Sequence, residues 1–180
     1  PGEKSPLLMY VGDDSGDNIS AQNCYYSELT GMYWAWKNSD ADYIGICHYR
    51  RYLLTHDGAL FDQRSVQKVL CSYDIITTKN LQLNFPYEEG FVHHHKKIYL
   101  DMTTQVVEEL YPEYTNTFQR LVKEKHTYFG NMLIAKKETY DAYMEWLFAI
   151  LFAVQARVKV EEEDSYHRRI FGFLSEFLQY

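Results

Sequence analysis

The sharpest chemical signal in the sequence is His48-Tyr49-Arg50-Arg51, which follows an apolar run that starts at Tyr43. An apolar strand has no structural need for two adjacent guanidinium groups, and a buried Arg is costly unless it is paired. The planar donors of Arg suit phosphate oxygens, so the motif predicts a site for a phosphate or diphosphate. The alternative is that Arg51 pairs with an internal carboxylate and that His48 is a hydrogen-bonded core residue.

Residues 43–53 are expected to form one buried strand that carries these side chains to a cleft. Because side chains alternate along a strand, His48 and Arg50 would share one face and Arg51 would point to the other. We therefore expect His48 and Arg50 to face a ligand and Arg51 to be the more structural member of the set.

Residues 12–18 form an acidic segment of turn-forming residues that contains Asp13, Asp14, Asp17 and Asn18. Carboxylate oxygens are the usual ligands of divalent cations, so this loop could hold Mg or Mn. The spacing is not that of a calcium-binding hand. A solvated turn that caps the following segment is the alternative.

Arg169 and Glu176 lie two helical turns apart on the last predicted helix, hence on one face, with Phe173 between them. A carboxylate among apolar groups can have its pKa raised into the range that suits a general base. The alternative is a structural ion pair between the two charged residues.

Asn131 follows Gly130 at the expected entry to a strand, where its short amide could fix either a hydroxyl group of a ligand or a backbone group. His93, His94 and His95 are consecutive, and in an extended segment they would point to alternate sides. They are therefore poor candidates for a shared metal, but His95 could contact a substrate from a loop.

The hydrophobic pattern predicts the elements that position these residues. Strands are expected at residues 7–11, 43–53, 73–77 and 129–135, and helices at 23–38, 63–70, 103–111, 138–158 and 165–178. Pro112 should end one helix and open the next, and residues 79–97 are expected to be irregular. Alternating strands and helices predict an α/β fold with a mainly parallel central sheet flanked by helices, whose ligands bind beyond the strand ends.

Composition narrows the class of protein. The 180 residues suit one domain spanning residues 1–180, and the missing initial Met suggests truncation at the N-terminus. The net charge of −7 argues against nucleic acid as a partner. Three cysteines without metal-ligand spacing favour a reducing cytoplasm, and no apolar run is long enough to span a membrane.

The longest motifs resemble those of a family of bacterial domains, formerly of unknown function, that occurs in glycosyltransferases of capsular and exopolysaccharide synthesis. The matching segments cover most of the chain and are residues 12–20, 26–38, 42–52, 73–76, 112–114, 131–134, 143–148 and 169–176. The resemblance implies a GT-A-like nucleotide-diphospho-sugar transferase fold. Many such enzymes carry an Asp-x-Asp metal motif where this chain has His48-Tyr49-Arg50, so here an Arg could neutralise the diphosphate directly.

The leading hypothesis is a glycosyltransferase that moves a sugar from a nucleotide-sugar, such as a UDP-sugar, to a glycan or lipid-linked acceptor. It would work in the cytoplasm, with peripheral association at the inner face of the cell membrane. Its donor site would comprise His48, Arg50, Arg51 and Asn131 together with Asp14 and Asn18, and its catalytic base would be Glu176 or Asp17, with Arg169 and His95 nearby.

Two other functions are compatible with the same residues. The 17 tyrosines could form a platform for a non-catalytic module that binds a glycan or a protein partner. The three consecutive histidines and the acidic loop could instead serve a metal-dependent hydrolase.

Overall fold

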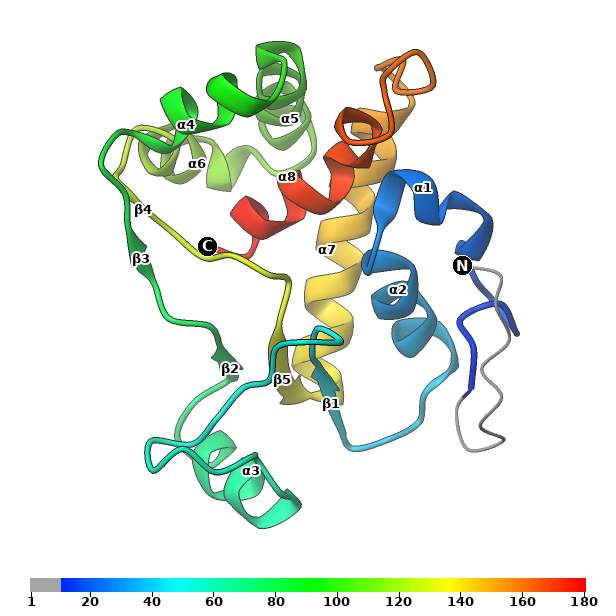
Figure 1. Cartoon of the computed structure of the whole chain (residues 1–180), viewed down its shortest axis with the longest axis vertical. Helices are drawn as coiled ribbons and strands as arrows, with labels where there is room; N and C mark the ends of the chain where they lie inside the picture. The colour runs from blue at the N-terminus through cyan, green and yellow to red at the C-terminus, as the bar shows by residue number, and fades with distance from the viewer. Residues whose placement is uncertain (1–10) are drawn as a thin grey trace.

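The longest helix, α7 (Lys137–Gln155), runs through the middle of the molecule, and the other elements surround it (Figure 1). The computed structural model describes residues 11–180, so the strand predicted at residues 7–11 lies, apart from Val11, outside the described residues. Helix α7 contains no Gly or Pro, and its broad apolar face is fully buried, as the sequence predicts. The buried residues are Tyr140, Met144, Leu147, Phe148, Ile150, Leu151 and Val154.

A three-stranded sheet lies against one side of α7 (Figure 1). Its order is β1 (Tyr43–Ile46), β5 (Leu133–Lys136) and β2 (Ile75–Thr77). The central strand β5 is covered on both faces: Leu133 and Ala135 join the main core with α7, whereas Ile134 joins a second core with α3 (Gln63–Leu70). The alternation of side chains along one strand thus separates the two cores.

The α/β class is confirmed, but the predicted parallel sheet is wrong for the described residues. Strand β5 pairs antiparallel with both β1 and β2, with Ile134 opposite Gly45 on one side and Ile76 on the other. Strands β1 and β2 run in the same direction but are not neighbours. After β2 the chain passes through several helices, and β5 then lies between β1 and β2 and runs in the opposite direction. Alternation of strands and helices along the sequence does not reveal this order.

The predicted long strand at residues 43–53 is also wrong, because β1 ends at Ile46. Residues 48–51 form a turn in which the Arg51 backbone N–H donates to the carbonyl oxygen of His48 at 3.1 Å. Of the four residues in β1, only Ile44 is buried. The side chains of His48, Arg50 and Arg51 therefore do not alternate between two faces as they would along a strand.

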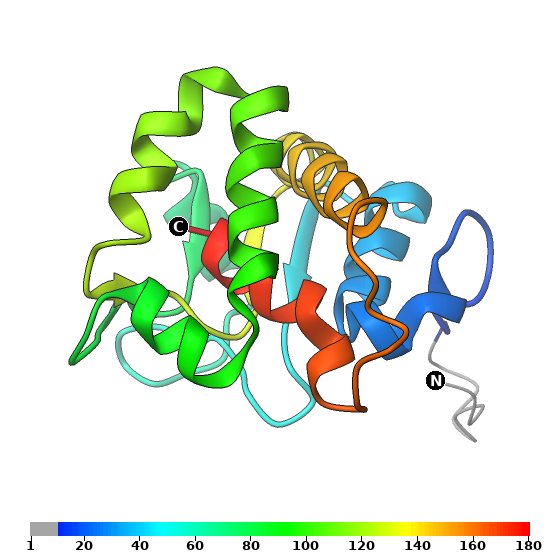
Figure 2. The ribbon, with the colours of Figure 1, turned by 90° about the horizontal axis from the view of Figure 1, so that it is seen from above.

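The segment between β2 and β5 is mostly helical. It contains β3 (Leu81–Gln82), α4 (Tyr87–His94), α5 (Lys97–Leu110), η2 (Pro112–Tyr114), α6 (Thr115–Leu121) and β4 (His126–Thr127), which pairs with β3. Figure 2 shows α5 and α6 side by side, joined through η2. The break at Pro112 is confirmed. The prediction that residues 79–97 are irregular missed α4, because only Tyr87 and Phe91 of that helix are buried and it contains Gly90, a poor helix former.

The N-terminal helix predicted at residues 23–38 is divided. After η1 (Ser20–Gln22), α1 (Asn23–Tyr26) and α2 (Leu29–Asn38) are separated at Ser27, whose φ of 53° is incompatible with a continuous helix. Helix α1 packs against α8 (Ile170–Leu178), which follows η3 (His167–Arg169). The break at Ser27 turns the α1–α2 junction toward the start of α8.

Two features of the described chain bear on the cellular setting. Within residues 11–180, no helix has both the length and the apolar surface that crossing a bilayer requires. The three cysteines are free and exposed.

The Tyr26 side chain joins α1 to the core. It is fully buried, stacks on Phe171 of α8 with ring centroids 4.7 Å apart, and donates a hydrogen bond to Gln155 at 2.9 Å. We predict that Tyr26→Ala lowers the free energy of unfolding by about 3–5 kcal/mol, as for other large aromatic residues replaced in cores. Urea denaturation measures this change.

The matched control is Tyr73→Ala, because the Tyr73 side chain is 68% exposed. This variant should stay within about 0.5 kcal/mol of the wild type. Equal stability of the two variants would contradict the packing described for α1.

Candidate functional site

A polar cleft of about 590 Å³ lies where the turn after β1, the α1–α2 junction, the entry to β5 and the start of α8 meet. We define it by six of its lining residues: Glu28, His48, Arg51, Gly130, Arg169 and Glu176. They come from four segments that are distant in the sequence. The cleft therefore depends on the tertiary fold rather than on any one motif.

Glu176 is a partly buried carboxylate of the polar cleft. Its Oε1 atom accepts a hydrogen bond from the Gly130 backbone N–H at 2.7 Å. The pKa of Glu176 is raised to about 7, by burial above all and also by the nearby Glu28 carboxylate, although the Gly130 N–H and Arg51 oppose the shift. A carboxylate whose pKa lies near neutrality suits proton transfer at physiological pH.

The Gly130–Asn131 turn presents this N–H to Glu176. Both residues have positive φ, 103° at Gly130 and 46° at Asn131, which Gly and Asn tolerate best. A side chain at position 130 would be strained at that φ, and its Cβ would lie 3.9 Å from Nη1 of Arg51. The turn therefore requires the glycine, whereas a Cβ at that distance would only be in ordinary contact with the guanidinium.

The Asn131 side chain makes internal bonds. It is 2% exposed, and its Nδ2 atom donates to Glu28 Oε1 at 2.7 Å and to the Gly172 carbonyl oxygen at 3.1 Å. Its Oδ1 atom accepts from the hydroxyl of Ser175 at 2.7 Å. Predicted to contact a donor sugar, Asn131 is instead placed to hold Glu28 and α8 in position.

Two arginines, Arg51 and Arg169, supply the positive side of the cleft, and His48 lines it beside them. Arg169 donates from Nε to the hydroxyl of Ser27 at 2.8 Å, which leaves its terminal amino groups for other partners. Within residues 11–180, neither Arg51 nor Arg169 forms an ion pair with a carboxylate. The alternative of a structural ion pair between Arg169 and Glu176 is therefore not what the structure shows.

An adjoining cavity of about 810 Å³ extends the polar cleft and adds Arg168. It shares Ser27, Glu28, His48 and Arg169 with the cleft. Three guanidinium groups thus line one continuous polar region, enough to balance the charge of a diphosphate.

The two adjacent arginines are placed differently from what strand alternation predicts. Arg51 lines the polar cleft, whereas the Arg50 guanidinium lies over the ring of Tyr49, 4.5 Å from its centroid, and lines neither polar cavity. The reason is the turn at residues 48–51, which directs consecutive side chains differently from a strand. His48 lines both polar cavities, as predicted.

The acidic loop lies outside the cleft. Asp17 accepts a hydrogen bond from the hydroxyl of Tyr33 at 3.2 Å, and its backbone bonds to the Asn38 side chain near the end of α2. Asn18 caps the following turn by accepting from the backbone N–H of Ser20. Neither Asp14, Asp17 nor Asn18 lines the cleft, so the alternative of a solvated capping turn is the better description.

The described residues do not form a binding site for the divalent cation that was considered for the acidic loop. Across residues 11–180, no three His, Cys, Asp or Glu side chains converge closely enough to hold a metal ion. The polar cleft itself offers the two carboxylates Glu28 and Glu176 beside cationic groups.

His95 caps the end of α4 and lies in a neighbouring pocket of about 310 Å³ that also reaches Glu176. Burial, together with the nearby His167 and His94, lowers the pKa of His95 to about 4, so the ring is neutral at pH 7. Because His93 and His94 belong to a helix, the prediction of an extended run of histidines is wrong.

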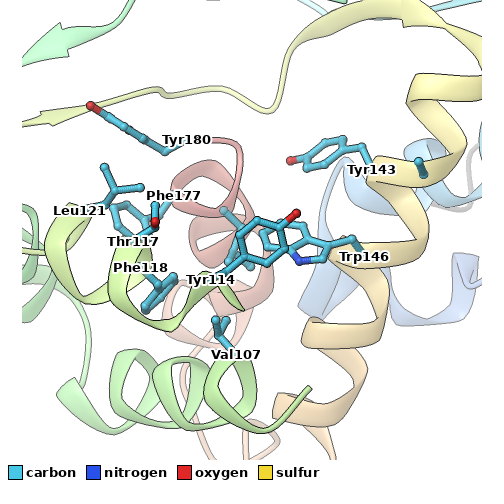
Figure 3. Close-up of a pocket in the computed structure, with 11 residues that line it drawn as sticks. Val107, Tyr114, Thr117, Phe118, Leu121, Tyr143, Trp146, Phe177 and Tyr180 are labelled. Atoms are coloured by element: carbon cyan, nitrogen blue, oxygen red, sulfur yellow. The ribbon is translucent and has the colours of Figure 1, made fainter. Parts of the chain in front are cut away.

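A further cavity of about 410 Å³ lies between α5, α6, α7 and α8 (Figure 3). Its lining includes Tyr143, Trp146 and Phe177 and contains no carboxylate or cation. Phe177 faces this cavity while its neighbour Glu176 faces the polar cleft, so α8 separates the two. The side chains that could take part in a reaction therefore lie on the cleft side of α8.

Two residues of the polar region were not predicted from the sequence. Glu28 lies at the break between α1 and α2, and that break has no clear sequence signal. Arg168 precedes Arg169, and this second pair of adjacent arginines is the same kind of signal as Arg50 and Arg51.

The raised pKa of Glu176 predicts how stability depends on pH. Because its pKa is higher in the folded chain than the ordinary value of 4.5, the folded state binds more protons between pH 4.5 and about 7. This contribution to the free energy of unfolding is full at low pH and is lost as pH rises through that window. Glu176→Gln should remove this pH dependence and gain stability relative to the wild type above pH 7.

Urea denaturation at several pH values tests this prediction, with Asp17→Asn as the control because Asp17 is exposed. A Glu176→Gln variant that keeps the wild-type slope between pH 4.5 and 7 would show that the carboxylate is not buried as described.

Comparison with known proteins adds three findings. Residues 2–180 match the family described as "Domain of unknown function (DUF4422)". No curated protein matches the chain. Among solved structures, the chain is similar to the apo structure of the bifunctional glycosyltransferase WbbM, with 27% sequence identity and a TM-score of 0.78.

The similarity to WbbM covers 93% of this chain but 35% of the WbbM chain. The chain therefore spans about a third of the length of that enzyme and shares its fold over that part. It belongs to the DUF4422 family.

Proposed function

We propose that this protein transfers a sugar from a nucleotide-sugar donor to a glycan acceptor. The observation that carries the proposal is the polar cleft, in which Glu176, a partly buried carboxylate with a pKa raised to about 7, lies beside Arg51 and Arg169. The similarity in fold to part of a glycosyltransferase supports it.

In the proposed reaction, the acceptor hydroxyl gives its proton to the Glu176 carboxylate as its oxygen forms a bond to the anomeric carbon of the donor. The bond between that carbon and the diphosphate breaks, and the nucleoside diphosphate leaves with the bonding electrons. Arg51 and Arg169 stabilise the negative charge that develops on the diphosphate. In this proposal the Arg groups do what a cation does in enzymes that carry an Asp-x-Asp motif.

Finer features of the proposal follow from the sequence. The donor is a UDP-sugar bound in a GT-A-like domain, and the acceptor is a glycan or lipid-linked glycan of capsular, exopolysaccharide or lipopolysaccharide synthesis. The reaction would take place in the cytoplasm, with peripheral association at the membrane. His48, which lines both polar cavities, contacts the donor.

The two adjacent arginines provide a matched test of the donor site. Arg51→Ala should weaken UDP binding roughly tenfold or more, because a charged hydrogen-bonding partner of the diphosphate is lost. Arg50→Ala should leave binding close to that of the wild type, since Arg50 stacks on Tyr49 outside the cleft. Isothermal titration calorimetry with UDP measures both.

A larger loss in Arg50→Ala than in Arg51→Ala would restore the prediction from strand alternation and would contradict the structure-based site. Absence of UDP binding by the wild type, combined with binding of oligosaccharides, would favour the alternative of a non-catalytic glycan-binding module.

The two candidate bases provide a second comparison. Glu176→Gln should reduce UDP release from a panel of UDP-sugars by about 10²- to 10⁴-fold, the usual contribution of a general base. Wild-type activity should rise with pH through about 7, as Glu176 loses its proton. Asp17→Asn should retain activity, since Asp17 lies outside the cleft. Loss of activity in Asp17→Asn alone would assign the base to the acidic loop instead.

A further inference from the structure

A second pocket, of about 310 Å³, meets the polar cleft at Glu176. We call it the aromatic pocket and define it by Phe85, Phe91, His95, Phe129, Tyr166 and Phe173. Phe129, Phe173 and Glu176 line both the aromatic pocket and the polar cleft. The carboxylate therefore stands at the boundary between two sites of different chemistry.

The difference in charge between the two sites is large. The polar cleft contains Arg51 and Arg169, whereas the aromatic pocket contains no Lys or Arg, and its His95 is neutral at pH 7 because its pKa is lowered to about 4. A diphosphate would be stabilised in the first site and not in the second. The aromatic pocket suits a neutral ligand.

Three large aromatic side chains around the aromatic pocket remain open to solvent. Phe85 is 36% exposed, Phe129 is 40% exposed and Tyr166 is 47% exposed. Exposed rings that line one concave site are a feature of ligand-binding surfaces rather than of a core. A sugar ring matches such a site, because it presents an apolar C–H face to an aromatic ring while its hydroxyl groups point outward.

The inner wall of the aromatic pocket is a stack of rings around His95. Its ring lies 4.4 Å from that of Phe173 and 5.9 Å from that of Tyr166, measured between centroids. Nδ1 of His95 is buried without a hydrogen-bond partner in the described structure. Because this nitrogen has almost no accessible surface, the wall presents aromatic faces rather than a polar atom to a ligand in the pocket.

Gly90 of α4 keeps the opposite wall in place. A Cβ at this position would lie 2.5 Å from the Phe85 ring, so only glycine allows Phe85 to pack over the helix. The pocket is thus built by residues whose positions depend on one another, from α4, the entry to β5 and the start of α8.

We propose that the aromatic pocket binds the acceptor sugar, with the hydroxyl to be glycosylated facing Glu176. The inference rests on the proposed function for the direction of transfer, but sugar binding in the pocket can be tested alone. The donor diphosphate then occupies the arginine side of Glu176, and the acceptor occupies the aromatic side.

The test measures sugar and nucleotide binding separately. Saturation-transfer NMR with methyl glycosides of glucose, galactose and mannose reports on the aromatic pocket, and calorimetry with UDP reports on the polar cleft. Tyr166→Ala and Phe85→Ala, which change rings that line the aromatic pocket but not the polar cleft, should each weaken glycoside binding about fivefold or more, the effect of losing one stacked ring, and leave UDP binding unchanged. Tyr73→Ala, which removes an exposed tyrosine elsewhere, should change neither.

His95→Phe separates ligand binding from folding. The substitution keeps an aromatic ring in the stack but removes the unpartnered Nδ1 atom. It should raise the melting temperature, since a buried polar atom without a partner is removed, and should leave glycoside binding within about twofold of the wild type, because the aromatic wall is kept. Loss of glycoside binding in this variant without loss of stability would contradict the aromatic pocket as described.

Two results would overturn the proposal: no methyl glycoside binds to the wild type, or Tyr166→Ala and Phe85→Ala weaken UDP binding as much as Arg51→Ala does. The second result would assign the aromatic pocket to the nucleotide. Glycoside binding that depends on Tyr166, in a protein that does not bind UDP, would leave the sugar site standing and refute the proposed transferase function.

Discussion

The hydrogen bond from the Gly130 N–H to Glu176 joins the two halves of the site, and the rest of the cleft depends on the turn that makes it. The turn requires positive φ at two successive residues, which Gly130 and Asn131 provide. Asn131 then ties the same turn to Glu28 and to α8 through three hydrogen bonds. The entry to β5, the α1–α2 junction and α8 are therefore fixed relative to one another around one carboxylate.

The environment of that carboxylate explains why two kinds of ligand could meet there. On one side, guanidinium groups without carboxylate partners in the described chain favour an anion; on the other, exposed aromatic rings favour an apolar, uncharged surface. Burial raises the pKa of Glu176, and the Gly130 N–H holds its carboxylate. The side chain is therefore neither fully solvated nor paired with an arginine. A residue in this position can exchange a proton without first breaking an ion pair.

Local sequence signals predicted much of the fold. The apolar face of α7, the bounds of α3 and the break at Pro112 all follow from patterns within a few residues. The placement of β5 between β1 and β2 could not be predicted, because strand order depends on contacts between distant segments. Helix α4 was missed since it buries only two side chains, too few for a periodic signal.

Local sequence signals likewise predicted only part of the candidate site. Glu176, His48 and Arg169 were identified from residue type and setting, and the structure brings them together in one cleft. The assignment of Arg50 over Arg51 failed because it assumed a strand where the chain forms a turn. The acidic loop had the composition of a cation site, but its position beside the end of α2 could be known only from the tertiary structure.

The most direct test of the central claim is a crystal structure of the protein with bound UDP. The account predicts that the diphosphate lies between Arg51 and Arg169, with the Glu176 carboxylate facing its open side and the aromatic pocket unoccupied by the nucleotide. A diphosphate bound at the acidic loop of residues 12–18, or at Arg50, would contradict it.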